Sequence, residues 1–161
     1  MIKYEDTIYN GVVKNGILYD GTGLLTDGEI GPVNSTEYNG KGWVGWNRTF
    51  SEQDGVDITF EFNWLQKFND VSIVININNE HGNVLFNNSR ILFSPTAYGF
   101  SGSSALQYFP KQLQLQTLIG NVNVKLPLCG NIAKFVRIQL YPGRGWILLS
   151  EIKFNSGICC M

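Results

Sequence analysis

Hydrophobic and polar residues alternate through much of this chain, a pattern that predicts β-strands rather than helices. The apolar residues of five segments are in phase at every second position: Ile58, Phe60 and Phe62; Val71, Ile73, Ile75 and Ile77; Val122, Val124 and Leu126; Val136, Ile138 and Leu140; and Leu148, Ile152 and Phe154. A period of two indicates strands with one buried and one wet face. Gln112 to Leu118 alternates Gln with Leu and also fits a strand.

Clusters of turn-forming residues separate these segments, at 31–42, 78–83, 100–104 and 142–145. The chain has 161 residues with 18 Gly, 13% aromatic and 16% charged residues, a profile typical of an all-β domain. We find no internal repeat and no linker. The sequence therefore predicts one antiparallel β-sandwich, of the jelly-roll type.

The charge balance and the apolar runs exclude two classes of partner. There are 12 Lys plus Arg and 13 Asp plus Glu without a basic cluster, so nucleic-acid binding is not expected. The apolar runs are too short to span a membrane. Residues 1–6 have no apolar h-region, so an export signal, if there is one, would lie outside this sequence, which would then be a fragment.

Catalytic chemistry has little support. The one histidine, His81, lies in an Asn-rich stretch expected to be a solvated loop. Nucleophile-elbow, phosphate-loop and zinc motifs are missing from the sequence. Cys129, Cys159 and Cys160 are odd in number and two are adjacent, so no disulfide framework is expected, and their usage slightly favours a reducing compartment. We expect a chain without a catalytic site.

Two carboxylates, Asp27 and Glu151, lie beside bulky apolar residues in distant parts of the chain. Burying an unpaired charge is costly, so a fold that brings the two together would favour a cation held by both. The alternatives are an Asp27 bonded to its own turn and a Glu151 facing water. Three glycosylation sequons also occur, at Asn34, Asn47 and Asn87, but chance alone predicts roughly two, so they permit secretion without arguing for it.

Four short segments carry a family resemblance by their order and spacing: Leu25-Thr26-Asp27-Gly28, Val44-Gly45-Trp46, Phe60-Glu61-Phe62 and Ser150-Glu151-Ile152. From about Tyr4 to Ser156, the chain resembles the second extracellular, discoidin-like domain of the discoidin domain receptors, which are collagen-activated receptor tyrosine kinases. The resemblance implies a discoidin-like domain over 4–156 with a tail at 157–161, and an eight-stranded, galactose-binding-like jelly roll.

The resemblance also implies a calcium ion that bridges the early loops and the last strand. Asp27 and Glu151 would be its carboxylate ligands, joined by Ser150 and by the main-chain carbonyl of Glu29. The family's other ligand positions fall on Glu5, Leu24, Lys41 and Trp43. Leu24, Lys41 and Trp43 have no side-chain oxygen and could offer carbonyls alone, whereas Glu5 or Asp6 could add a carboxylate; calcium accepts such mixed sets of about six to eight oxygens.

A family disulfide has its cysteine positions at Ile91 and Ile138 in this chain. Because both cysteines are replaced by the same apolar residue, we predict that Ile91 and Ile138 touch in the core. Cys129 occupies neither position, and we expect a free thiol there.

The function implied by the resemblance is that of a non-catalytic, glycosylated module outside the cell, within a single-pass plasma-membrane receptor active in cell adhesion. Its expected partners are the adjacent discoidin domain, collagen indirectly and a second receptor in a dimer. The alternative from the residues is a carbohydrate- or ligand-binding module that uses aromatic side chains, although core packing is the competing role for each of them. These aromatic residues are Trp43, Trp46, Tyr98, Phe100 and Tyr108.

Overall fold

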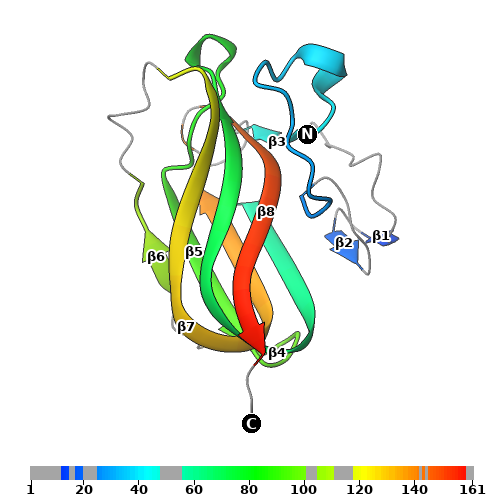
Figure 1. The fold of residues 1–161 in the computed structure, drawn as a ribbon, viewed down its shortest axis with the longest axis vertical. Helices are drawn as coiled ribbons and strands as arrows, with labels where there is room; N and C mark the ends of the chain where they lie inside the picture. The colour runs from blue at the N-terminus through cyan, green and yellow to red at the C-terminus, as the bar shows by residue number, and fades with distance from the viewer. Residues whose placement is uncertain are drawn as a thin grey trace.

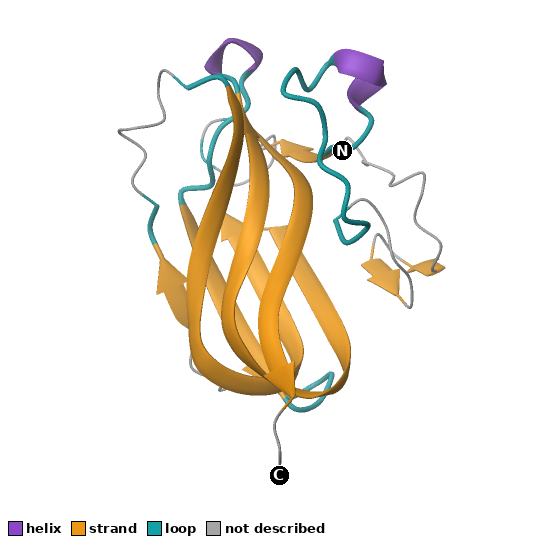
Figure 2. Cartoon of the chain, viewed as in Figure 1, coloured by secondary structure: helices purple, strands orange, loops and turns teal. Residues whose placement is uncertain are grey.

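A computed structural model describes residues 12–14, 17–19, 25–47, 56–100, 105–110, 118–141, 143 and 145–158. Strands dominate this part of the chain (Figure 2). The short strands β1 (Val12–Lys14) and β2 (Ile17–Tyr19) form a two-stranded sheet. A six-stranded antiparallel sheet contains β3 (Val44–Asn47), β4 (Val56–Ile77), β5 (Asn88–Ser94), β6 (Leu106–Tyr108), β7 (Gly120–Tyr141) and β8 (Trp146–Ile158). Two 3-10 turns, η1 (Glu37–Gly40) and η2 (Asn79–His81), complete these elements.

The long strands β4 and β7 each contribute to both layers of a sandwich. The order in the sheet is β3-β8-β4-β7-β5-β6. The first part of β4 pairs with the last part of β7, from Val56↔Leu140 to Glu61↔Phe135, and the ladder resumes at Gln66↔Ala133 after a break. At this break the paired strands curve together, so that the sheet folds over itself (Figure 1). The predicted all-β sandwich is confirmed.

The core lies between the two layers and is built from the residues that alternate in the sequence. Four side chains of β4, Val71, Ile73, Ile75 and Ile77, are at most 1% exposed. Val136, Ile138 and Leu140 of β7 are fully buried in the same cluster.

Ile91 in β5 lies directly opposite Ile138 in β7, and both side chains are 0% exposed. Directly opposed side chains on one face of an antiparallel pair are neighbours. The predicted contact between Ile91 and Ile138 in the core is thus confirmed.

The phase predicted for the last strand is wrong in its first half. Ile147 and Leu149 in β8 are fully buried, whereas Leu148, which was grouped with Ile152 and Phe154, is half-buried. The reason is a β-bulge: Val74 pairs with Glu151 and Ile75 with Leu149, which leaves Ser150 as an extra residue. One extra residue in a strand reverses the alternation of its side chains.

Other predicted elements are confirmed in part. His81 is exposed in η2, in the connection between β4 and β5, as expected for a loop histidine. Most of the predicted strand Gln112–Leu118 lies outside the described residues. In the part of the chain that the structure covers, no helix is both long enough and apolar enough to cross a membrane.

Candidate functional site

The bulge in β8 lies against the loop 25–31, and hydrogen bonds join the two segments. The backbone N–H of Ile152 donates to the carbonyl of Leu25 (2.8 Å), and that of Gly28 donates to Glu151 Oε2 (3.1 Å). The N–H of Gly31 donates to Ser150 Oγ (2.7 Å). Neighbouring side chains of a regular strand point to opposite faces, so the bulge explains how Ser150 and Glu151 both reach this loop.

Local geometry fixes the shape of the loop. Asp27 Oδ1 accepts a hydrogen bond from the N–H of Glu29 (2.8 Å), the self-bonded turn that Asp commonly forms. Gly28 between them has φ of 83°, a left-handed conformation that favours glycine. We call Asp27, Glu29, Ser150 and Glu151 the clasp, since they tie this loop to β8.

Trp43 lies beneath the loop. Its side chain is 2% exposed, and its indole N–H donates to the carbonyl of Pro32 (3.1 Å). A Cβ on Gly31 would lie only 2.4 Å from Trp43 Nε1, so glycine is required for this close approach. The Trp43 side chain therefore supports the clasp by packing, and its main-chain carbonyl is the one oxygen that it could offer a cation.

The two carboxylates of Asp27 and Glu151 lie near enough to interact electrostatically. The pKa of Glu151 is raised, chiefly because burial disfavours its charged form. The Asp27 carboxylate raises it further, while the N–H of Gly28 and the charge of Lys153 lower it. The hydrogen bonds above use Asp27 Oδ1 and Glu151 Oε2, so the second oxygen of each carboxylate is left outside them.

The donor atoms of the clasp suit a hard cation. Ser150 Oγ lies 3.4 Å from the carbonyl oxygen of Glu29, so carboxylate, hydroxyl and carbonyl oxygens gather here, the kinds that calcium prefers. Among the described residues, no group of three or more His, Cys, Asp or Glu side chains could hold a metal ion. A calcium ion would therefore depend on carbonyl and hydroxyl oxygens as well as on the two carboxylates.

The structure describes some of the remaining predicted site residues and not others. Lys41 is exposed, and its N–H bonds to the carbonyl of Tyr38. Glu5 and Leu24 lie outside the described residues. Asn34 and Asn87 are exposed; Asn47 pairs through its backbone in β3, but its side chain is outside the described part.

A network of asparagine side chains holds residues 31–35, which follow Glu29 in the chain. The hydrophobic pattern of the sequence does not reveal this network. Asn83 Nδ2 donates to Ser35 Oγ and Asn76 Oδ1, both at 2.9 Å. Asn76 Nδ2 donates to the carbonyl of Val33 (2.8 Å) and to Asn121 Oδ1 (3.0 Å), and Asn121 Nδ2 donates to the carbonyl of Gly31 (2.9 Å). The one available signal is Asn76 itself, an amide between Ile75 and Ile77 that is fully buried.

Two of the five candidate ligand-binding aromatic residues belong to the interior. Trp43 is 2% and Phe100 6% exposed, and the Phe100 ring packs against the Arg137 guanidinium at 4.3 Å. Trp46 and Tyr108 are half-buried, whereas Tyr98 is 94% exposed. For Trp43 and Phe100, the competing role of core packing is the one observed.

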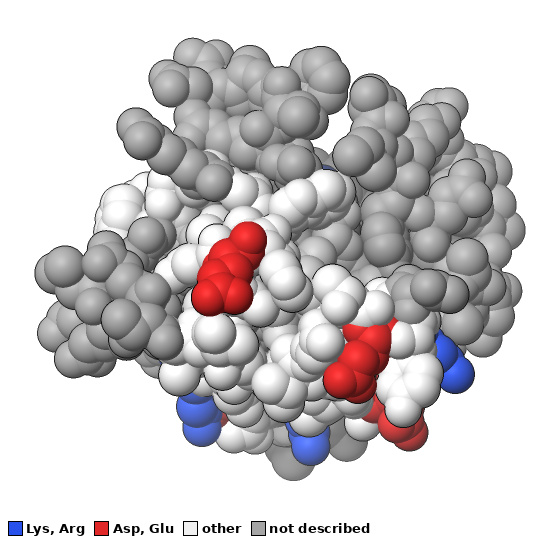
Figure 3. Space-filling view, turned by 90° about the horizontal axis from the view of Figure 1, so that it is seen from above, with Lys and Arg blue, Asp and Glu red and all other residues white. Residues whose placement is uncertain are grey.

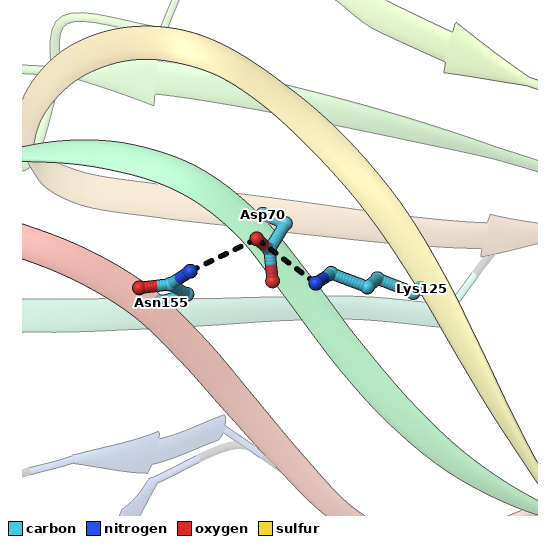
Figure 4. Close-up of polar contacts among 3 residues, drawn as sticks. All are labelled: Asp70, Lys125 and Asn155. Atoms are coloured by element: carbon cyan, nitrogen blue, oxygen red, sulfur yellow. Dashed lines mark hydrogen bonds and ion pairs between the residues drawn. The ribbon is translucent and has the colours of Figure 1, made fainter.

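A carboxylate elsewhere on the surface offers a contrast to Glu151. Asp70 Oδ2 accepts from Asn155 Nδ2 (3.0 Å) and pairs with Lys125 Nζ (3.3 Å), with the three side chains on the neighbouring strands β4, β8 and β7 (Figure 4). Asp70 thus has a cationic partner within the protein. In the view from above, Asp and Glu side chains form separate groups on the visible surface, and Lys and Arg lie toward its edge (Figure 3).

The fold is shared with β-sandwich modules of known structure. The C-terminal domain of a chitobiase from Bacteroides fragilis matches with a TM-score of 0.55 and 12% identity, over 88% of this chain and 84% of that chain. CpGH89CBM32-6 produced by Clostridium perfringens matches with a TM-score of 0.50 and 17% identity, over 95% of both chains. At these identities the likeness establishes the fold alone.

The family is established by the sequence comparisons. The family model described as "Discoidin domain-containing receptor 1/2, DS-like domain" matches residues 1–156, so the chain belongs to this family of DS-like domains. Discoidin domain-containing receptor A of Caenorhabditis elegans is 30% identical over 139 residues, which cover 84% of this chain and 17% of the relative. Epithelial discoidin domain-containing receptor 1 of Mus musculus is 25% identical over 168 residues, 98% of this chain and 18% of the relative.

These matches confirm the predicted resemblance, and a discoidin-like domain is a non-catalytic module. The chain corresponds to less than a fifth of each of these two receptors, at 17% and 18% of their lengths.

Proposed function

We propose that this domain is a calcium-stabilised module of the extracellular part of a collagen receptor, where it supports the ligand-binding discoidin domain and receptor activation. Membership of the DS-like family supports a receptor context. The adjacent discoidin domain, collagen as an indirect ligand and a receptor dimer are part of the same proposal, as is a single-pass receptor at the plasma membrane.

The observation that carries the proposal is the convergence of loop 25–31 and the β8 bulge. Asp27 and Glu151 would hold the calcium ion through carboxylate oxygens, Ser150 through its hydroxyl and Glu29 through its carbonyl. Main-chain carbonyls of Leu24, Lys41 and Trp43, and a carboxylate from Glu5, would complete the ligand set. When bound, the ion supplies positive charge between two carboxylates that otherwise repel each other.

The residues of the clasp themselves position the loop. Ser150 Oγ and Glu151 Oε2 accept backbone N–H groups of Gly31 and Gly28, and the asparagine network fixes the carbonyls of Gly31 and Val33. A cation that binds only the folded domain would add stability by mass action. The loop would then present one conformation to a neighbouring domain.

Collagen binding by the parent protein at the cell surface tests this function. At free calcium that fills the wild-type site, we expect Glu151→Gln and Asp27→Asn to weaken collagen binding. Asp70→Asn should leave it unchanged, because the Asp70 carboxylate lies outside the clasp, beside Lys125 and Asn155. Surface abundance of each variant, measured by antibody, is the control. Collagen binding that is equal in all variants at equal abundance would refute the supporting role.

Sugar binding is the second candidate, and Tyr98 is the residue that favours it. Its ring is 94% exposed and could stack on a sugar, and one structural neighbour is the CBM32 of AlyQ in complex with 4,5-unsaturated mannuronic acid. A glycan array of the immobilised domain, compared with Tyr98→Ala, separates the candidates. Reproducible binding lost in Tyr98→Ala would support sugar recognition, and an empty array would reject it.

A further inference from the structure

The sequons at Asn34 and Asn87 end in different hydroxyl residues, Thr36 and Ser89, and they also differ in the structure. At the first, the side chain of Asn34 is exposed on the turn that leads into η1. Asn34 Oδ1 accepts hydrogen bonds from Thr36 Oγ1 (2.8 Å) and from the Thr36 N–H (3.2 Å). The hydroxyl that the acceptor motif requires is therefore already in contact with the asparagine amide.

The sequon at Asn87 lacks this arrangement. Its hydroxyl residue, Ser89, is 0% exposed in β5, and Asn87 itself donates its N–H to the carbonyl of Tyr141. The Asn87 side chain also lies against Gly143, where an added Cβ would be 2.9 Å from Asn87 Oδ1. Once β5 has formed, the Ser89 hydroxyl is out of reach of any enzyme.

We propose that Asn34 is an N-glycosylation site of this domain and that it is occupied more fully than Asn87. The co-reactant is an oligosaccharide linked to a polyprenyl diphosphate. Asn34 Nδ2 forms a bond to the anomeric carbon of the first sugar and loses one proton. The bond from that carbon to the phosphate oxygen breaks, and the polyprenyl diphosphate leaves with the electron pair. This inference rests on the proposed extracellular placement.

The surroundings of Asn34 can accommodate a glycan. Thr36, Glu37 and Tyr38 are exposed beside it, Tyr38 by 78%. The residues on either side of Asn34 are held by buried asparagines: Asn83 Nδ2 donates to the Ser35 hydroxyl, and Asn76 Nδ2 donates to the carbonyl of Val33. A glycan would therefore extend outward from a fixed turn without disturbing the core.

A glycan at Asn34 also limits where partners bind. Ile30 and Val33, on the same loop, are 60% and 58% exposed. Sugar attached next to Val33 would cover aliphatic surface close to the clasp.

Peptide mapping of the domain secreted from eukaryotic cells tests the proposal. A cleavable secretion signal is supplied, so the chain meets the transferase whatever its native location. Enzymatic deglycosylation in heavy-oxygen water converts each modified asparagine to labelled aspartate. We expect label on most copies of the Asn34 peptide and on fewer copies of the Asn87 peptide.

Matched variants isolate the site. Thr36→Val should remove the mass of one glycan, Thr36→Ser should lower occupancy, and Ser89→Ala should cause a smaller loss than Thr36→Val. The Asn34 peptide of the secreted wild-type protein makes the test independent of how well any variant folds. An unlabelled Asn34 peptide, or an Asn87 peptide labelled more fully, would overturn the proposal. Surface biotinylation of the parent protein tests the extracellular placement separately.

Discussion

A disulfide introduced between positions 91 and 138 would test the register of the core. Ile91 and Ile138 are directly opposed in the antiparallel pair of β5 and β7, and both are fully buried. Directly opposed residues have Cα atoms about 4.5–5.5 Å apart, within the range that a disulfide bridges. We therefore expect Ile91→Cys combined with Ile138→Cys to form a cross-link under mild oxidation.

The stabilisation follows from the loop that the cross-link closes. A loop of about fifty residues corresponds to roughly 4 kcal/mol of lost chain entropy in the unfolded state. For a domain of this size, each kcal/mol shifts the melting temperature by about 2–4 °C, so the cross-link is worth about 8–16 °C. Comparing the oxidised and reduced forms of the same variant removes the cost of the two lost isoleucines.

Thiol titration measures whether the cross-link forms, and thermal unfolding measures the stabilisation. Both use a protein in which the three natural cysteines are replaced by serine. The matched control pairs Ile91→Cys with Arg137→Cys. Arg137 is opposite Leu92, one position along the ladder, so its side chain lies on the other face of the sheet. Two free thiols in the Ile91/Ile138 variant, or a cross-link in the control, would refute the register.

Three further predictions concern the clasp and its support, each read by unfolding in denaturant. Ser150→Ala leaves the Gly31 N–H without its acceptor and should cost about 1–3 kcal/mol; an unchanged midpoint would count against this hydrogen bond. In calcium-free buffer, the raised pKa of Glu151 means that the folded domain holds this proton more tightly than the unfolded chain. The free energy of unfolding should therefore rise as the pH falls through the pKa of the folded domain toward that of the unfolded chain. Glu151→Gln should remove this rise and should be more stable than wild type at pH 7. Parallel pH profiles of variant and wild type would contradict this prediction. Asn76→Ala removes one hydrogen-bond partner from each of Asn83 and Asn121 and should lower the free energy of unfolding by at least about 2 kcal/mol. A denaturation midpoint equal to that of the wild type would contradict this prediction.

Much of the fold could be predicted from the alternation of apolar and polar residues. A strand with one buried and one solvated face has apolar residues at every second position, and this period is visible in the sequence. The alternation of Val71 to Ile77 and of Val136 to Leu140 was sufficient to locate the core. The contact between Ile91 and Ile138 required the family resemblance, since no local pattern pairs residues in different strands.

The details of the site were less predictable. The bulge at Ser150 is visible only in the pairing with β4, where Val74 and Ile75 oppose Glu151 and Leu149. In the sequence, Leu148 continues the even-numbered phase of Ile152 and Phe154, and this conceals the extra residue. The buried Asn76 was likewise indistinguishable from an exposed polar residue, because its partners lie in three other segments.

Thermal unfolding of the isolated domain in calcium and in chelator tests the central claim, that Asp27 and Glu151 form a calcium clasp. At free calcium about a hundredfold above the dissociation constant, binding adds about 2.7 kcal/mol, which raises the melting temperature by about 5–11 °C. Asp27→Asn and Glu151→Gln should abolish the rise, and Asp70→Asn should retain it. Wild-type melting curves that coincide in calcium and in chelator would contradict the claim.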